Sequence, residues 1–388
     1  TISCTRLGDS PQNPNILPEN QNANRYVQKQ NNTGVDEDTK NILQKLTETT
    51  TDKPDKATAL SFQIALARTL KKNPLLVATL LEINSKEGLI IQSKLWQNPE
   101  ISLGVEHLFG KNGSNAVESQ IQISQVIELG GKIKRRSKVA EAEKSVAIQE
   151  ALSTRIEVLA EVSLLFMDVV ENQFKWEQEL RNAEIAKSIY DVVNEKVKAG
   201  KVSPLEEKKA LLVLNQSQLR LNQTISSFNS SKIKLVKMWG SQAVDFEKVD
   251  YQLGFVDEPP AFTEFEKQII NSPAVLLGQL KVELEEQRAT LERANATPDL
   301  SVNTAFQKYE ENSDKTFALG VSIPLTIFNR NQGNIKSADA LKMKARAEST
   351  NTNNTINSEL IEMYNELQTS HKKLITLKKD IYPAAKSV

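Results

Sequence analysis

The feature that most constrains the fold is a long stretch without helix breakers. From Lys132 to Ala199 the chain contains neither glycine nor proline. A helix of this span would be about 100 Å long at 1.5 Å per residue, which is far longer than the helices of ordinary globular domains. Apolar residues recur in it at intervals of three and four, so we predict one apolar stripe along the helix: Leu152, Ile156, Leu159, Val162, Phe166 and Val169.

A second helix is expected to run back along the first. The sequence KAGKVSP interrupts the helical pattern, which then resumes over residues 205–239. Apolar residues in this segment lie seven apart, which is the spacing of coiled coils: Leu214, Leu221, Phe228 and Leu235, with Leu211 and Ile225 at companion positions. We therefore predict an antiparallel helical hairpin over 132–239. Its tip is expected at Gly200, Lys201, Val202, Ser203 and Pro204.

Two short segments before the long helix alternate apolar and polar residues. Ile101 and Leu103 take alternate places in the first segment, and Ile121 and Ile123 do so in the second. The sequence GKNGSN between them is typical of a turn. The pattern predicts a β-hairpin over about 99–129. Its second strand leads directly into the long helix through Gly130 and Gly131, and glycine can adopt the backbone angles of such a turn.

Glycine and proline recur at matched places in the two halves of the chain. Pro74 and Pro99 are separated by the same number of residues as Pro273 and Pro298. Alternating residues predict a second β-hairpin over about 298–327, and a second stretch without glycine or proline follows it. Glycine and proline at matched positions in the two halves indicate an internal duplication.

The duplication predicts the organisation of the chain. Residues 1–56 are rich in Asn, Gln, Thr and Asp, which predicts a disordered or extended arm. The first structural repeat is expected over 57–246, with its first helix beginning near Ala57. A linker and the second repeat are expected over 247–388, with a long helix over 331–388. The first repeat continues through a tip and a return helix, so we expect about 50 further residues in an untruncated second repeat. The second turn from strand to helix is expected at Pro324, Asn329 and Gly333.

Four strands in one chain are too few to close a barrel, which needs roughly eight. No run of apolar residues is long enough for a transmembrane helix, and open sheet edges are not tolerated in lipid. We therefore expect several chains to share one transmembrane barrel, from which the helices continue into water. The predicted fold class is mainly α with a small β part: long antiparallel helical hairpins and four transmembrane strands per chain.

The two turns from strand to helix resemble a known family. ISQVIELGGKIKRRSKVAEAE at 123–143 and VSIPLTIFNRNQGNIKSADA at 321–340 are similar to the heavy-metal (CzcC-like) branch of the TolC-like outer-membrane efflux channels. The resemblance covers about residues 57–388. It implies a homotrimer with a 12-stranded β-barrel in outer-membrane lipid and a helical tunnel across the periplasm. It also implies a periplasmic adaptor (membrane fusion) protein and a proton-driven, RND-type inner-membrane pump as partners.

Two further functions remain open alongside heavy-metal efflux. One is a drug-efflux or type I secretion duct, which sequence patterns do not separate from a metal channel. The other is a soluble coiled-coil scaffold, which would account for the helices but not for four alternating strands at matched places. We place adaptor docking at the tip, where a compact turn admits close approach by a partner. The same residues also suit a turn with no partner.

Composition argues against other classes of function. The chain has 49 basic and 49 acidic residues, and this balance does not favour nucleic acid as a partner. The two histidines, His107 and His371, lie in different halves without a cluster of metal-ligating residues nearby in sequence. We therefore expect no enzymatic activity, no cofactor and no metal site, and we expect the pump to select the cargo. Four basic residues after Gly131 either meet lipid phosphates or form a solvated helix start: Lys132, Lys134, Arg135 and Arg136.

The single cysteine, Cys4, excludes an internal disulfide framework. It follows a small residue near the start of the chain, as the lipid-modified cysteine of a bacterial lipoprotein does. Lipid attachment and a free thiol in a disordered tail are both open interpretations.

Overall fold

The computed structural model describes residues 59–106, 118–251, 258–309 and 314–387. All of them belong to the unit Asp55–Val388. The N-terminal arm, including Cys4, and the first hairpin loop, including His107, lie outside the described residues. Among the described helices, none combines the length and the apolar character needed to cross a membrane.

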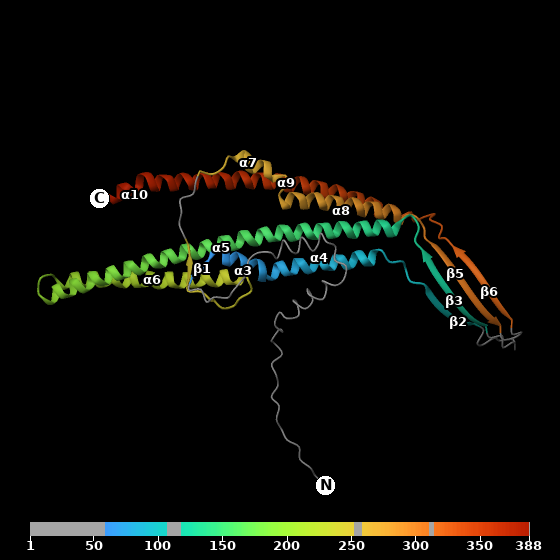
Figure 1. The fold of residues 1–388 in the computed structure, drawn as a ribbon, viewed down its shortest axis with the longest axis horizontal. Helices are drawn as coiled ribbons and strands as arrows, with labels where there is room; N and C mark the ends of the chain where they lie inside the picture. Colours follow the sequence, from blue (N-terminus) through green and yellow to red (C-terminus); the bar gives the residue numbers. More distant parts are fainter. Residues whose placement is uncertain (1–58, 107–117, 252–257, 310–313, 388) are drawn as a thin grey trace, which may run out of the picture. The chain divides into compact units, whose positions relative to one another are not determined.

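A long antiparallel helical hairpin is the largest element (Figure 1). Helix α5, Lys132–Lys198, has 67 residues, and α6, Pro204–Lys237, has 34 residues and packs back along its C-terminal part. Leu214, Phe228 and Leu235 are buried on α6, as the heptad pattern predicts. The companion residues of that pattern are exposed, because α5 covers only one side of α6: Leu211 and Ile225.

The two halves place equivalent helices against α5. Helix α4, Pro74–Ser93, and helix α8, Pro273–Asn295, both pack on α5. Each begins with proline in its first turn and is capped by a polar side chain, Asn73 on α4 and Ser272 on α8. Proline suits this position because the first helical N–H has no partner inside the helix. Helix α9, Gln332–Thr376, packs on α8 and continues through a π turn, Leu377–Ile381, into the short helix α10, Tyr382–Lys386.

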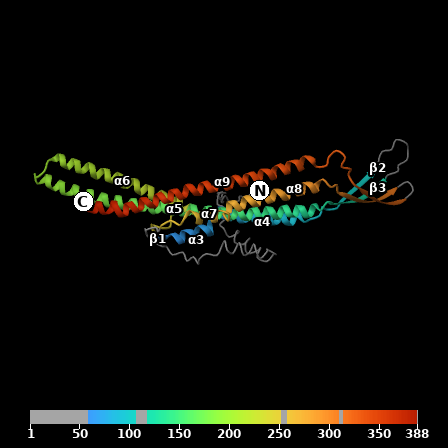
Figure 2. The same ribbon diagram turned by 90° about the horizontal axis from the view of Figure 1, so that it is seen from above.

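The two predicted hairpins join into one antiparallel sheet at one end of the helices (Figures 1 and 2). Its strands are β2, Glu100–Glu106; β3, Glu118–Ile127; β5, Leu300–Tyr309; and β6, Lys315–Ser322. The order β2-β3-β5-β6 places the second strand of the first half beside the first strand of the second half. Strands β2 and β6 are the two edges of this sheet.

The main hydrophobic core lies where the start of the described chain meets the end of α6. Helix α3, Phe62–Lys72, packs on α5, and the ring of Trp176 on α5 stacks on Phe228 of α6 with centroids 5.6 Å apart. Close by, the strand β1, Ala59–Ser61, pairs in parallel with β4, Lys248–Asp250. Leu60 in β1 is buried in the core.

The helix predicted from Ala57 is wrong for residues 59–61. These residues form β1, and Ser61 then caps α3, which begins only at Phe62. The strand forms because β4, which is far away in sequence, supplies its hydrogen-bond partners. The broader prediction of long helices with a small antiparallel sheet is confirmed. A short helix, α7, Phe262–Ile269, lies against α9 through the rings of Phe262 and Tyr364.

Candidate functional site

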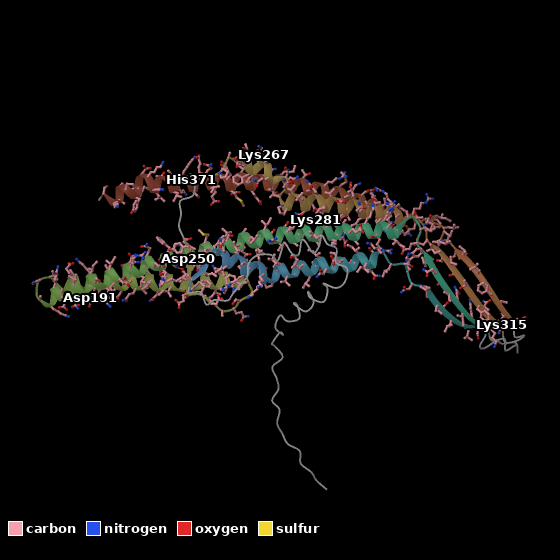
Figure 3. The ribbon with its side chains drawn as sticks, viewed as in Figure 1. Asp191, Asp250, Lys267, Lys281, Lys315 and His371 are labelled. Carbon is pink, nitrogen blue, oxygen red and sulfur yellow. The ribbon has the colours of Figure 1, made fainter. Side chains whose placement is uncertain are left out.

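One face of the four-stranded sheet is apolar. Residues that pair across an antiparallel sheet point to the same side, so each row of paired residues shares a face. One such row runs through all four strands: Leu103, Ile121, Phe306 and Phe317. The neighbouring row on this face consists of Ile101, Ile123, Thr304 and Leu319. Lysine enters this face only near the hairpin loops, where Lys315 lies at the end of the sheet farthest from the helices (Figure 3).

The opposite face is polar and carries small side chains. Its rows alternate with the apolar rows and pair hydroxyl, amide and small residues: Ser102, Gln122, Ala305 and Ala318; then Gly104, Gln120, Gln307 and Thr316. The amides of Gln120 and Gln122 approach each other at 3.4 Å. A sheet with this pattern separates an apolar environment from water.

The apolar face is uncovered within one chain. Leu103 is 76% exposed and Phe317 is 72% exposed. Aromatic and aliphatic side chains gathered over four strands form a patch that monomeric soluble proteins rarely expose. This face therefore requires lipid or protein as its partner.

The first turn from strand to helix is held by a buried carboxylate. Glu128 has a side chain only 5% exposed, and its oxygens accept hydrogen bonds from Arg136 at 2.9 and 3.1 Å. The Arg136 guanidinium also donates to the backbone carbonyls of Ser93 and Leu95. Arg136 thereby joins the start of α5 to the end of α4, which restricts the angle at which β3 leads into α5.

Gly130 and Gly131 form the turn itself. Their φ angles are +70° and +69°, in the left-handed region that favours glycine. A Cβ on Gly130 would lie 2.9 Å from the Cβ of Thr297, so the second half of the chain also leaves no space for a side chain. Asp299 completes the contact, because its Oδ1 accepts from the Leu129 N–H at 3.0 Å and from Lys132 Nζ at 2.7 Å.

The basic cluster after Gly131 therefore has two parts. Lys132 and Arg136 make ion pairs within the chain, so they are not the free lipid-binding cations that the sequence also allowed. Lys134 and Arg135 are exposed. The prediction of contact with lipid phosphate remains for these two residues.

The second turn from strand to helix is longer and uses asparagine. Pro324 and Asn329 lie in the exposed segment between β6 and α9, and Gly333 lies in the first turn of α9. The left-handed residue here is Asn331, with φ +60°, and its amide donates to the Glu292 carbonyl and carboxylate at 2.7 Å each. The assignment to Gly333 overlooked Asn331, although asparagine is the non-glycine residue that best tolerates this conformation.

The hairpin tip is closed by its own backbone. Gly200 has φ +69°, and the Lys201 N–H bonds to the Lys196 carbonyl at 2.9 Å, as in a Schellman end. Ser203 Oγ accepts from the Leu205 N–H, and Pro204 occupies the first position of α6. Nothing lies within 4 Å of a Cβ built on Gly200. The turn is therefore compact and open to solvent.

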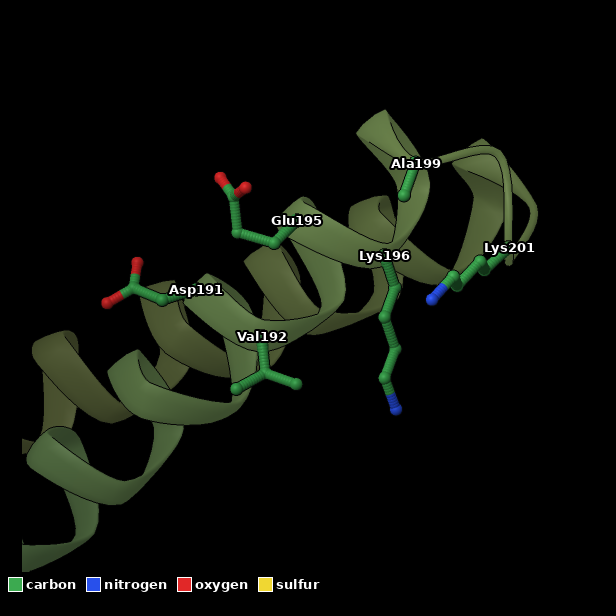
Figure 4. Close-up of a pocket in the computed structure, with 6 residues that line it drawn as sticks. All are labelled: Asp191, Val192, Glu195, Lys196, Ala199 and Lys201. Carbon is green, nitrogen blue, oxygen red and sulfur yellow. The ribbon is translucent and has the colours of Figure 1, made fainter.

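Charges flank the tip on α5. A hollow of about 460 Å³ lies there, lined by Asp191, Val192, Glu195, Lys196, Ala199 and Lys201. Figure 4 shows the carboxylates of Asp191 and Glu195 on one side of the helix and the Lys196 and Lys201 side chains on another. Glu195 also bonds to Lys198 Nζ at 2.9 Å, which raises the pKa of Lys198.

Metal-binding groups do not gather in the described part of the chain. Among residues 59–106, 118–251, 258–309 and 314–387, no three His, Cys, Asp or Glu side chains lie close enough to hold one ion. His371 lies on α9 (Figure 3).

Solved structures share this fold. A membrane protein from Pseudomonas aeruginosa superposes with a TM-score of 0.67 at 17% identity, covering 84% of this chain and 78% of that chain. The Campylobacter jejuni CmeC outer membrane channel superposes with a TM-score of 0.63 at 17% identity, covering 88% and 79%. At these identities the likeness establishes the fold alone.

Curated relatives are similar in sequence. The cobalt-zinc-cadmium resistance protein CzcC of Cupriavidus metallidurans is 29% identical over 326 residues, which is 84% of this chain and 77% of that protein. The nickel-cobalt-cadmium resistance protein NccC of Alcaligenes xylosoxydans xylosoxydans is 20% identical over 73% of this chain and 64% of its own length. Residues 65–241 and 266–388 match the family described as outer membrane efflux protein, and the chain therefore belongs to that family.

Proposed function

We propose that this outer membrane efflux channel works as a homotrimer that exports heavy-metal cations delivered by an inner-membrane pump and a periplasmic adaptor. The observation that carries the proposal is the sheet with one apolar and one polar face, placed at the end of a long helical hairpin. A soluble coiled-coil scaffold does not account for a sheet with one exposed apolar face.

The open edges of the sheet support the trimer. Among the residues that the structure describes, strands β2 and β6 each lack a partner on one side, and lipid does not satisfy unpaired backbone groups. Three chains with four strands each make about twelve strands, an even number within the range of closed outer-membrane barrels. The apolar rows then face lipid and the polar rows face the lumen.

The chemistry of the polar face suits a passive duct. Glutamine, asparagine, serine and threonine side chains offer dipoles to a hydrated ion without binding it tightly, because they carry no net charge. Gln122 and Gln307 lie in adjacent rows of this face. The ion can then leave on the outer side without breaking strong contacts with the channel.

The tip supports adaptor docking. Gly200 to Pro204 close the hairpin at the end of α5 that lies opposite the sheet (Figure 1). The open space around Gly200 admits the backbone of a partner helix. Acidic and basic side chains on separate sides of α5 provide the polar rim that an interface needs.

The two curated relatives support heavy-metal cations as cargo, because one is a cobalt-zinc-cadmium resistance protein and the other is a nickel-cobalt-cadmium resistance protein. The test is a strain that lacks its own channel but retains pump and adaptor, supplied with this gene. We expect restored tolerance to cobalt, zinc or cadmium salts and no change in tolerance to organic drugs. Tolerance restored to drugs and not to metals would assign the chain to drug efflux. Failure to restore either, with normal amounts of protein in the outer membrane, would contradict the proposed function.

A further inference from the structure

The internal repeat predicts two copies of one contact, of which the chain itself makes the first. Within the chain, the end of β3 and the start of α5 rest on the start of β5, where Asp299 accepts hydrogen bonds from Leu129 and Lys132. Lys132 Nζ and Asp299 Oδ1 are 2.7 Å apart, with side chains 12% and 28% exposed. This contact joins the second strand of one half to the first strand of the other.

In the described part of the chain, the second half does not make the corresponding contact. Ser124 and Ser322 are equivalent by the repeat, so Arg330 corresponds to Lys132 by sequence count. Lys132 begins α5, whereas Arg330 lies two residues before the start of α9. Arg330 is exposed, and among the ion pairs of the described residues it has no acidic partner. Its Nε donates only to the Thr326 carbonyl, at 3.3 Å.

The residue equivalent to Asp299 also makes no ion pair among the described residues. Pro99 and Pro298 are equivalent, so Glu100 corresponds to Asp299 as the residue that follows proline. Glu100 is the first residue of the edge strand β2 and is exposed. Arg330 and Glu100 thus carry opposite charges. Glu100 begins one edge strand, and Arg330 lies in the segment that follows the other edge strand, between β6 and α9.

We propose that Arg330 pairs with Glu100 of the partner subunit, and that β6 pairs with the partner's β2 in the register that β3 and β5 adopt within the chain. This inference rests on the proposed trimer. Transfer of the β3–β5 pairs places Val321 opposite Val105 of the partner subunit. The same transfer places Ile323 opposite Leu103 of the partner subunit, and Leu325 opposite Ile101 of the partner subunit.

Two independent observations support this register. The first is the face of the sheet: Val321 and Val105 both belong to the apolar face, and Ile323 and Leu325 continue its alternation just beyond the end of β6 at Ser322, whereas a shift by one residue would bring apolar beside polar side chains. The second is exposure, because both edges carry uncovered apolar side chains of similar size: Val321, Ile323 and Leu325 on one edge, and Ile101, Leu103 and Val105 on the other.

Cysteine pairs test the register in the full-length protein. In a Cys4→Ser background, the double variant Val105→Cys and Val321→Cys should form covalent dimers and trimers after mild oxidation of outer membranes. The matched control is Leu103→Cys with Val321→Cys, whose side chains share a face but would lie about 7 Å apart, too far for an unstrained disulfide. This control variant should give at most one tenth as much covalently linked protein as the Val105→Cys and Val321→Cys variant.

Charge reversal tests the ion pair. Arg330→Glu and Glu100→Arg should each weaken the trimer about tenfold in detergent, because each leaves two like charges together, and the double reversal should restore it. Linking in the control pair, or no restoration by the double reversal, would overturn the inference while the Cys4→Ser protein remains trimeric and exports. A monomeric Cys4→Ser protein that also fails to export would instead contradict the proposed function.

Discussion

At the scale of single residues, a buried glutamine side chain makes hydrogen bonds to a strand that a neighbouring strand would usually make. Gln173 on α5 is 4% exposed, and its amide accepts from the Val249 N–H at 2.8 Å and donates to the Val249 carbonyl at 3.3 Å. The side chain thereby satisfies both backbone groups of the central residue of β4 and ties the β1–β4 pair to the long hairpin. An amide can do this because it carries one acceptor and donors in a plane.

We expect Gln173→Leu to lower the free energy of unfolding by about 2 kcal/mol, since two buried backbone groups would lose their partner. Thermal unfolding in detergent measures the loss, and faster amide exchange at Val249 locates it. Gln218→Leu on the exposed side of α6 is the matched control. Equal stability of both variants, with protection at Val249 retained, would show that the amide does not hold the strand.

At the scale of elements, the long hairpin combines a periodic interface with a specific end. The heptad residues of α6 meet α5, but Ile156 of the predicted α5 stripe is exposed, and Val158 is buried instead. The stripe differs because α5 meets α3, α4, α6 and α8 at different points along its length. The position at which the hairpin ends, Gly200, is determined by capping hydrogen bonds between neighbouring residues and not by this packing.

Gly200→Trp should abolish export and leave the trimer intact, because the bulk would block adaptor approach while the side chain points into open space. Backbone strain at φ +69° is separated from bulk by Gly200→Asn, since asparagine tolerates this conformation. We expect Gly200→Asn to retain most export. Metal tolerance and detergent-extracted trimer are measured for both variants. Export at the normal rate by the tryptophan variant would exclude the tip from docking.

At the scale of the whole molecule, the helices and the sheet have different surfaces. Its helices are amphipathic and carry many interhelical ion pairs, such as Arg288 with Glu143 at 2.8 Å and Lys144 with Glu87 at 3.0 Å. The large apolar side chains of its sheet gather on one face. Balanced charge and a modest apolar fraction are compatible with a membrane location if, as proposed above, the sheet is the part of the described chain that contacts lipid.

Two adjacent residues of β2 test this division. Leu103→Lys should reduce the amount of channel in the outer membrane severely, since lysine on the lipid face of a barrel costs about 2–4 kcal/mol near the bilayer midplane. Ser102→Lys, on the polar face, should insert normally. Quantitative blots of outer-membrane fractions compare the two variants. Similar levels for both would contradict the assigned faces of the sheet.

Local pattern allowed the long helices, the strands and the tip to be predicted. Breaker-free runs, alternation at Ile101 and Leu103, and the cap residues at Gly200 and Ser203 act through neighbours in sequence. The repeat also showed Pro74 and Pro273 at matched positions, and these residues begin the equivalent helices α4 and α8. Adaptor docking at the tip, contact of Lys134 and Arg135 with lipid, and lipid attachment at Cys4 stay predictions.

The sequence by itself thus determined the long helices, the four strands of the two hairpins and which residues of those strands share a face, because periodicity is a property of the local chain. Only the tertiary structure decided that residues 59–61 pair with β4, that Asn331 takes the left-handed position, and that Asp299 accepts from Lys132. Each of these contacts joins residues distant in sequence or depends on the geometry of such a contact. Backbone hydrogen bonds and ion pairs across such separations leave no periodic trace in the chain.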